Sequence, residues 1–235
     1  PSGARIYNIP IATAQGCNLT PSISLVYNSH AGNNVAGYGW SIGGLSAITV
    51  RNSNIFYDDA AQGGVYDSTS AKYVLDGVPL VTSDAGVSDY SLATARGNIL
   101  VQKHTNASGQ AKYFSALYPD GSTATFGFTT NWDPRNSYPI SLLTDKDGNT
   151  VHFYYTQTGN YYYINSITYC NGARIDFTYS SRSDVAPDQY SYYGQSLPFP
   201  QKLLSGITSQ NGNETICEYL LSHEYSDGVS LLTKV

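Results

Sequence analysis

The sequence has 235 residues, of which 41% are hydrophobic, 13% aromatic and only 12% charged, with a net charge of −5. Disordered chains combine low hydrophobicity with high net charge, so this composition excludes a disordered protein. Methionine is absent and glutamate is rare, whereas tyrosine, threonine, serine and glycine are abundant. Because strands favour β-branched and aromatic residues while helices favour Ala, Leu, Glu, Lys and Met, we predict an all-β fold and exclude a coiled coil or helical bundle.

The charge balance and hydropathy exclude further classes of function. Lysine and arginine number 12 against 17 aspartates and glutamates, with no basic cluster, which argues against nucleic acid or an anionic membrane as partner. No apolar run approaches the ~18 residues of a membrane span, and the start lacks a signal-peptide pattern. Because the sequence begins at Pro1 and contains no methionine, we expect it to be a processed or excised part of a longer chain.

The first 50 residues predict a glycine-rich β block. Strands are expected at residues 22–28 and 47–51, where β-branched and aromatic side chains gather. Between them, the glycines of residues 37–44 favour bulges, turns and close approach of backbones, and they exclude a helix. We expect an opening block at residues 1–110 that continues into a hairpin region at residues 111–235, the two forming one structural unit.

From residue 110 onward a β-hairpin unit recurs. Its three copies are residues 140–155 with a turn at Asp147-Gly148, residues 164–179 with Asn171-Gly172, and residues 203–221 with Asn211-Gly212. Looser relatives turn at Asp76-Gly77 and Asp120-Gly121. Such dipeptides between alternating apolar residues predict type I′ turns, which need positive φ at both central positions.

The repeat predicts how the sheet is built. A short hairpin cannot bury its apolar side alone, so successive hairpins must dock on one another and form an antiparallel sheet. In the third copy the apolar return positions fall two residues later, which predicts a longer turn. Residues 182–200, rich in Tyr, Ser and Pro, are expected to form an ordered excursion or surface loop.

Three segments of the opening block, together with the hairpins, are similar to a known family. The residues that carry the resemblance lie in Tyr7–Ile11, Pro21–Ser29 and Gly37–Gly44, and those singled out are Pro10, Tyr27, Asn28, Gly37, Gly39, Trp40, Ser41 and Gly43, with the turn glycines Gly148, Gly172 and Gly212. The sequence resembles the amino-terminal domain shared by the SpvB virulence protein and the TcaC/TcB components of insecticidal toxin complexes.

The resemblance implies a structural module rather than an enzyme. It implies a bacterial protein, secreted or at the cell surface, in which this domain lies upstream of Rhs/YD repeats. The domain would contribute β-sheet wall to a shell that encloses a carboxy-terminal passenger. Its expected partners are the downstream repeats of the same polypeptide and other toxin-complex components.

One enzyme motif matches by letter. Gly39-Trp40-Ser41-Ile42-Gly43 fits the G-x-S-x-G nucleophile elbow of α/β-hydrolases, which requires a helix directly after the serine. The residues after Gly43 instead predict a strand, so we favour a packing role for this segment, with Trp40 and Ile42 on one face.

Clustered tyrosines give the main alternative function. Exposed rings at Tyr161, Tyr162, Tyr163, Tyr192 and Tyr193 could stack on sugars or contact a protein partner, as in a surface adhesion or carbohydrate-binding module. Tyrosines on a two-sided sheet more often pack along their cross-strand neighbours, and we favour that structural interpretation.

No metal site or cofactor is predicted. The four histidines are scattered, and His152 is expected to face solvent because Val151 and Phe153 flank it. An Asp-Gly turn explains residues 145–149 better than a calcium loop does, since the closing glutamate is missing. Cys17, Cys170 and Cys217 are expected to be free buried thiols, with one disulfide left open, and Cys217 to act as a small buried hydrophobe.

Overall fold

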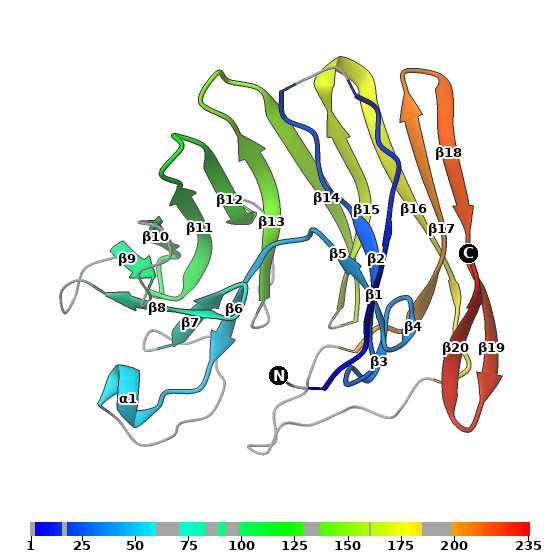
Figure 1. Cartoon of the computed structure of the whole chain (residues 1–235). Helices are drawn as coiled ribbons and strands as arrows, with labels where there is room; N and C mark the ends of the chain where they lie inside the picture. The colour runs from blue at the N-terminus through cyan, green and yellow to red at the C-terminus, as the bar shows by residue number, and fades with distance from the viewer. Residues whose placement is uncertain are drawn as a thin grey trace. The chain divides into compact units, whose positions relative to one another are not determined.

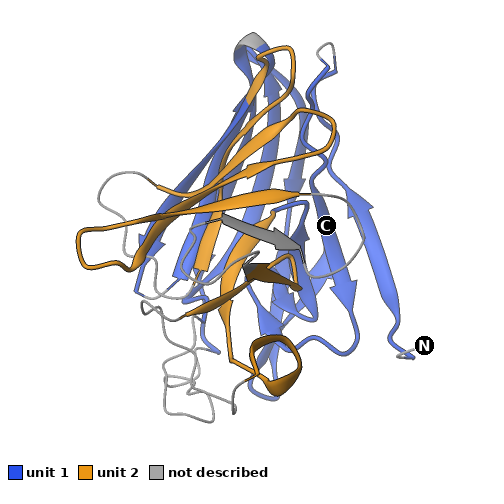
Figure 2. Ribbon diagram, turned by 90° about the vertical axis from the view of Figure 1, so that its left-hand side faces the viewer, with its two compact units in different colours: residues 1–45, 151–235 blue, residues 46–150 orange. Residues whose placement is uncertain are grey.

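The computed structural model describes residues 3–15, 18–59, 71–82, 89–92, 99–128, 137–159, 161–184 and 199–235. Nearly all the regular structure within them is antiparallel β-sheet, which confirms the predicted fold class. The chain divides into two compact units, residues 1–45 with 151–235 and residues 46–150, coloured blue and orange in Figure 2. The two units are divided after residues 45 and 150, so unit 2 is inserted within the sequence of unit 1. From the sequence pattern we expected a boundary near residue 110.

Unit 1 consists of two groups of strands (Figure 1). From the start of the chain come β1 (Ile6–Pro10), β2 (Ser24–Asn28), β3 (Asn33–Asn34), β4 (Gly37–Tyr38) and β5 (Trp40–Gly43). From the second half come β14 (Thr150–Thr158), β15 (Tyr161–Tyr169), β16 (Ala173–Ser181), β17 (Lys202–Asn211), β18 (Glu214–Leu220), β19 (Ser222–Ser226) and β20 (Val229–Lys234). Strands β1-β2-β5 form one sheet, β14 to β18 pair in chain order, and β3-β4 and β19-β20 are separate two-stranded ladders.

The period-2 alternation of the repeat decides which face of β14 to β18 is buried. On β14, Val151 and Phe153 are buried while His152 and Tyr154 are exposed, so the prediction for His152 is confirmed. The segment between β1 and β2 is hydrogen-bonded to the same sheet through tyrosines of that sheet. The backbone N–H of Ala12 donates to the Tyr219 hydroxyl and that of Ala14 to the Tyr169 hydroxyl, each at 2.9 Å.

Unit 2 is a hydrogen-bonded ring of strands. Its elements are β6 (Ala47–Arg51), α1 (Ile55–Asp58), β7 (Lys72–Leu75), β8 (Val78–Thr82), β9 (Asp89–Leu92), β10 (Leu100–Thr105), β11 (Ala111–Leu117), β12 (Thr123–Gly127) and β13 (Ser137–Thr144). Strands β6 to β12 pair in chain order, and β13 pairs with both β12 and β6. The strand predicted at residues 47–51 is therefore confirmed and takes part in closing the ring.

Aromatic side chains fill the core of unit 2. Tyr73, Phe114 and Tyr138 are fully buried, and their rings meet edge to face with centroids 4.9 to 6.1 Å apart. The Tyr138 hydroxyl donates to the Ala111 carbonyl oxygen at 3.0 Å, which satisfies its polar end. The alternating residues of this part of the chain thus form a packed interior.

Three loops of the described chain share one five-residue turn. Residues 106–110, 118–122 and 145–149 each have glycine in fourth place, with φ of 77°, 85° and 86°. In each loop the first N–H donates to the fifth carbonyl and the glycine N–H to the first carbonyl, at 2.9 to 3.1 Å. Only the glycine has positive φ, so the type I′ turns predicted at Asp120-Gly121 and Asp147-Gly148 are wrong.

Two-residue turns occur elsewhere. Asp76-Gly77 has φ of 48° and 81°, which confirms a type I′ turn there, and Asp227-Gly228, which the sequence analysis did not use, has 50° and 81°.

The remaining two predicted type I′ turns are wrong. At the third repeat copy Asn211 pairs with Glu214, so the loop is Gly212-Asn213 with positive φ at Gly212 alone, a type II′ turn rather than a longer one. In this copy the apolar residues of the returning strand come two positions later than in the other copies, and the pairing of the two strands has a register shift between Ser209 and Gln210. In the second copy the loop is residues 170–172, with positive φ at its first and last residues.

The cysteines differ from the expectation of buried free thiols. Cys170 is disulfide-bonded, so the expectation is wrong at this position, and Cys17 lies outside the described residues. Cys217 is a free thiol but is only half-buried. Val151 and Ile175, which hold the corresponding repeat positions, are completely buried, whereas Cys217 lies on β18, the last strand of its sheet.

Candidate functional site

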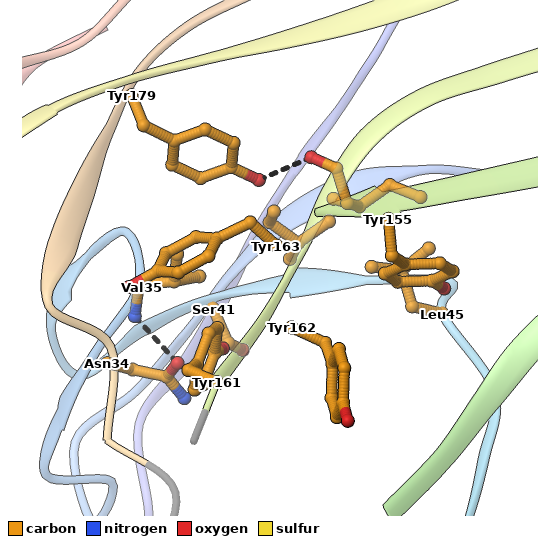
Figure 3. A pocket seen from close by; sticks show the side chains of 11 residues that line it. Asn34, Val35, Ser41, Leu45, Tyr155, Tyr161, Tyr162, Tyr163 and Tyr179 are labelled. Carbon is orange, nitrogen blue, oxygen red and sulfur yellow. Dashed lines mark hydrogen bonds between the residues drawn. The ribbon is translucent and has the colours of Figure 1, made fainter. Parts of the chain in front are cut away.

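A cavity in unit 1 gathers three of the five tyrosines predicted as binding residues. Tyr161, Tyr162 and Tyr163 on β15 line a partly open space of about 210 Å³ (Figure 3). Tyr192 and Tyr193 lie outside the described residues. The run of tyrosines therefore contributes to a recess as well as to packing.

The cavity is lined by strands from both groups of unit 1. Tyr155 of β14 and Tyr179 of β16 join the β15 tyrosines on one side. The opening block contributes Asn34, Val35, Ser41, Ile42 and Leu45. None of the lining residues is charged, so the site offers aromatic and aliphatic surface together with neutral hydrogen-bonding groups.

Two of the tyrosines are held rigidly. The Tyr163 ring is 3% exposed and lies 4.8 Å from the Tyr161 ring and 5.0 Å from that of Tyr179, between centroids. Its hydroxyl accepts the backbone N–H of Lys202 at 3.0 Å, and the Tyr179 hydroxyl donates to the Ile164 carbonyl oxygen at 2.7 Å. Tyr163 is thus part of the core and cannot act as an exposed stacking platform.

Burial strengthens the preference of these phenols for the neutral form, which an ordinary tyrosine also has at physiological pH. It raises the pKa of Tyr161 to about 12 and the pKa of Tyr155 and Tyr179 further above the ordinary value, with smaller contributions from neighbouring tyrosines. At physiological pH the hydroxyls can therefore donate and accept hydrogen bonds but carry no charge.

Ser41 does not lie on a nucleophile elbow. It is in the middle of β5, opposite Val26 of β2, and the next element along the chain is strand β6. The helix that an elbow needs after its serine is therefore missing from this segment. Ser41 instead faces the tyrosine-lined cavity, and its hydroxyl has no hydrogen-bond partner among the described residues.

The opening-block motif forms a tightly packed corner. The Trp40 ring lies 5.4 Å from that of Tyr27, and the Asn28 N–H donates to the Gly39 carbonyl oxygen at 2.9 Å. Gly39 has φ of +78°, and a Cβ there would lie 2.5 Å from Tyr27 Cε2. Only glycine fits this position without strain.

The other motif residues also have structural positions. Pro10 is exposed at the end of β1, opposite Ser24. A Cβ at Gly43 would lie 2.6 Å from Val26 Cγ2, and one at Gly37 would lie 2.9 Å from the Ser230 carbonyl oxygen. Gly148, Gly172 and Gly212 are the turn glycines described above.

A buried ion pair was missed by the sequence analysis. The side chains of Arg182 and Asp184 are fully buried, with Arg182 Nε donating to Asp184 Oδ1 at 2.7 Å. Arg182 also donates to the carbonyl oxygens of Asn34 and Pro200 at 3.1 Å and to Asn33 Oδ1 at 3.0 Å. Asp184 Oδ2 accepts from Asn33 Nδ2 at 2.6 Å and from the Ser230 N–H at 2.7 Å.

This network joins β3, the end of β16 and β20, which are far apart in the sequence. An arginine two residues before an aspartate was its only local signal, and that pattern is also met by the exposed pair Arg174–Asp176. The local sequence therefore does not distinguish the buried Arg182–Asp184 pair from the exposed Arg174–Asp176 pair.

Among the described residues, no group of three or more His, Cys, Asp or Glu side chains is arranged to hold a metal ion. The described part of the chain also has no helix with the length and apolar character that crossing a membrane requires.

Sequence comparison identifies a family match over most of the chain. The family model described as SpvB, Salmonella virulence plasmid 65kDa B protein, matches residues 1–182. No curated protein sequence matches the chain.

Solved structures share the fold at low sequence identity. The N-terminal domain of effector protein SpvB from Salmonella typhimurium strain LT2 superposes with a TM-score of 0.73 at 13% identity, over 97% of this chain and 96% of that one. The Photorhabdus luminescens Tc holotoxin pore gives 0.71 at 16% identity, over 99% of this chain and 14% of its match. The TcdB2-TccC3-Cdc42 crystal structure gives 0.69 at 15% identity, over 98% and 15%. The chain thus spans about the length of the first structure and a small fraction of the other two.

Proposed function

Because the chain belongs to the SpvB family, we propose that it is a non-catalytic structural domain of a bacterial toxin-like protein. It would contribute β-sheet wall to a shell that encloses a carboxy-terminal passenger. The fold shared with Tc toxin structures supports this proposal, since those chains are several times longer than this one and contain the same fold as one part.

The observation that carries the proposal is the edge of the β14–β18 sheet. Among the described residues β18 pairs on one side only, with β17. Its side chains Ile216 and Leu220 are 42% and 64% exposed. An exposed edge strand with apolar side chains invites aggregation unless another strand pairs with it. Pairing onward with hairpins of the same polypeptide would remove that hazard and extend the wall.

The proposed partners follow from this edge. They are downstream Rhs/YD repeats of the same polypeptide and, through the assembled shell, other toxin-complex components. A protein with this role would be secreted or carried on the bacterial surface.

Amide hydrogen exchange tests the wall role. The chain alone is compared with a longer polypeptide that includes the segment following Val235 in its gene. We expect the amides of β18 to exchange more slowly in the longer polypeptide, while those of the ring-forming strands β10 and β11 serve as an internal control and stay unchanged. Equal exchange at β18 in both polypeptides would overturn the proposal.

A further inference from the structure

In the tyrosine-lined cavity of unit 1, three polar side-chain groups have no hydrogen-bond partner among the described residues. Asn34 Oδ1 accepts the Val35 N–H at 2.7 Å, but Asn34 Nδ2 has no partner among the described residues. The hydroxyls of Ser41 and Tyr161 likewise make no hydrogen bond there. All three residues line the cavity, and Figure 3 shows them near one another in its view.

The lining defines the chemistry of a ligand. A charged ligand would lose its hydration without meeting an opposite charge, which makes it unfavourable here. The tyrosine rings and the aliphatic residues Val35, Ile42 and Leu45 suit a flat ring with apolar faces. Asn34, Ser41 and Tyr161 together provide donors and acceptors for a ligand that has both.

The volume limits the size of the ligand. Sites for drug-sized molecules span roughly 300–1,000 Å³. A cavity of about 210 Å³ is below that range and admits a single ring.

The polar groups of the cavity decide what kind of ring fits. A purely aromatic ring would cover the three polar groups without giving them hydrogen bonds, which is costly. A ring that carries hydroxyl groups satisfies them.

We propose that this cavity binds one neutral monosaccharide ring, as a free sugar or as the terminal residue of a glycan. The hydroxyl groups of the sugar bond to Asn34, Ser41 and Tyr161, and its C–H face lies against the tyrosine rings. The site is independent of the wall role, because it lies inside unit 1 and away from the open edge of β18.

Saturation-transfer NMR on the full chain tests the site directly. Glucose, galactose, mannose and N-acetylglucosamine are titrated as probes, and we expect at least one to bind in the millimolar range, as is reasonable for one small ring. Ser41→Ala and Tyr161→Phe each remove one hydroxyl and are expected to weaken binding about tenfold. Tyr154→Phe is the matched control, since Tyr154 is exposed on the opposite face of β14, and it should bind as the unmodified chain does.

Circular dichroism of every variant ensures that a loss of binding is not a loss of fold. Three results would overturn the proposal: no saturation transfer to any of the four sugars, binding by the Ser41→Ala and Tyr161→Phe variants as tight as that of the unmodified chain, or binding of N-acetyltyrosinamide in place of the sugars. The last result would assign the cavity to an aromatic side chain. None of these results bears on hydrogen exchange at β18, so the two proposals fail separately.

Discussion

At the scale of single residues, Arg182 and Asp184 show how a buried ion pair can hold distant segments together. Such a pair is stable only when every donor and acceptor is satisfied, because both charges have lost their hydration. Here Asn33, Ser230 and two backbone carbonyls complete the network. The network is therefore one of the contacts that attach the β19-β20 hairpin and the β3-β4 hairpin within unit 1.

We predict that Arg182→Met lowers the free energy of unfolding by about 3–5 kcal/mol, because Asp184 would remain charged and buried without its cation. Urea denaturation followed by circular dichroism measures the loss. Arg174→Met, which removes the cation of the exposed Arg174–Asp176 pair, is the matched control and should cost less than about 1 kcal/mol. Equal losses in the two variants would contradict the assignment.

Asp184 also predicts a dependence of stability on pH. Burial by itself would raise its pKa, but hydrogen bonds from Arg182, Asn33 and Ser230 outweigh burial and hold the pKa well below the usual range. The unfolded chain takes up this proton near pH 4 and the native chain only at lower pH. Stability from this group is therefore complete above about pH 4 and is lost as the pH falls below it.

Urea denaturation at a series of pH values from about 6 down to about 3 checks this sign. The Asp184→Asn variant should be less stable at every pH, and its stability should fall less steeply with acid than that of the unmodified chain. Parallel curves for the two proteins would show that Asp184 is not the group responsible.

Gly39 gives a second prediction at the residue scale. Gly39→Ala should cost about 1–3 kcal/mol, because alanine would be forced to a φ of +78° and would meet the Tyr27 ring. Gly32→Ala in the same block is the control, since a Cβ at Gly32 would have no atom within 4 Å and should change stability little. Thermal melts of both variants, followed by circular dichroism, compare them; a melt of Gly39→Ala like that of the control would be evidence against strain at this corner.

At the scale of elements, the turns show that one dipeptide can serve different geometries. Asp76-Gly77 is a two-residue turn with both residues left-handed, whereas Asp147-Gly148 belongs to a five-residue loop in which only the glycine is left-handed. The sequence located both turns correctly. The length of each loop depends on the register of its flanking residues, which a dipeptide does not specify.

We predict that Asp76→Ala costs more stability than Asp147→Ala. Asp76 tolerates φ of 48° and accepts hydrogen bonds from the Ser46 hydroxyl at 2.6 Å and the Ala47 N–H at 2.9 Å, whereas Asp147 is exposed and outside the left-handed region. The expected loss is about 1–2 kcal/mol at Asp76 and about 0.5 kcal/mol or less at Asp147. Chemical denaturation of both variants measures the difference, and the opposite order would contradict the turn assignment.

At the scale of the whole molecule, unit 2 is an insertion whose strands all find partners within it. The ring β6 to β13 closes through pairings of β13 with β12 and β6, and the buried rings of Tyr73, Phe114 and Tyr138 fill its core. Closure removes free strand edges, which is a common way for β-structure to become stable and soluble.

A polypeptide of residues 46–150 is therefore expected to fold by itself. It should show a β-type circular dichroism spectrum, a cooperative melt and dispersed amide NMR signals. Phe114→Ala in the same polypeptide should cost about 3–5 kcal/mol and serves as the check that the native core has formed. A polypeptide without cooperative unfolding would show that the ring depends on unit 1.

The family resemblance, the β content and the positions of the turns were available from sequence, because they rest on local composition and on side chains one or two positions apart. The same local signals identified β6 from Ala47 to Arg51 and the outward direction of His152. They also drew attention to Tyr161, Tyr162 and Tyr163, although not to the cavity that these residues share with Ser41 and Asn34.

Only the tertiary structure decided the loop geometries, the ring closure of unit 2, the disulfide at Cys170 and the Arg182–Asp184 network. Each depends on residues that meet after folding, as Asn33 and Asp184 do across 151 positions of sequence. A buried charge is stable only where such distant partners converge. Local sequence therefore specified the strands, and long-range contacts decided which polar groups of this protein are satisfied and which are left to face the cavity.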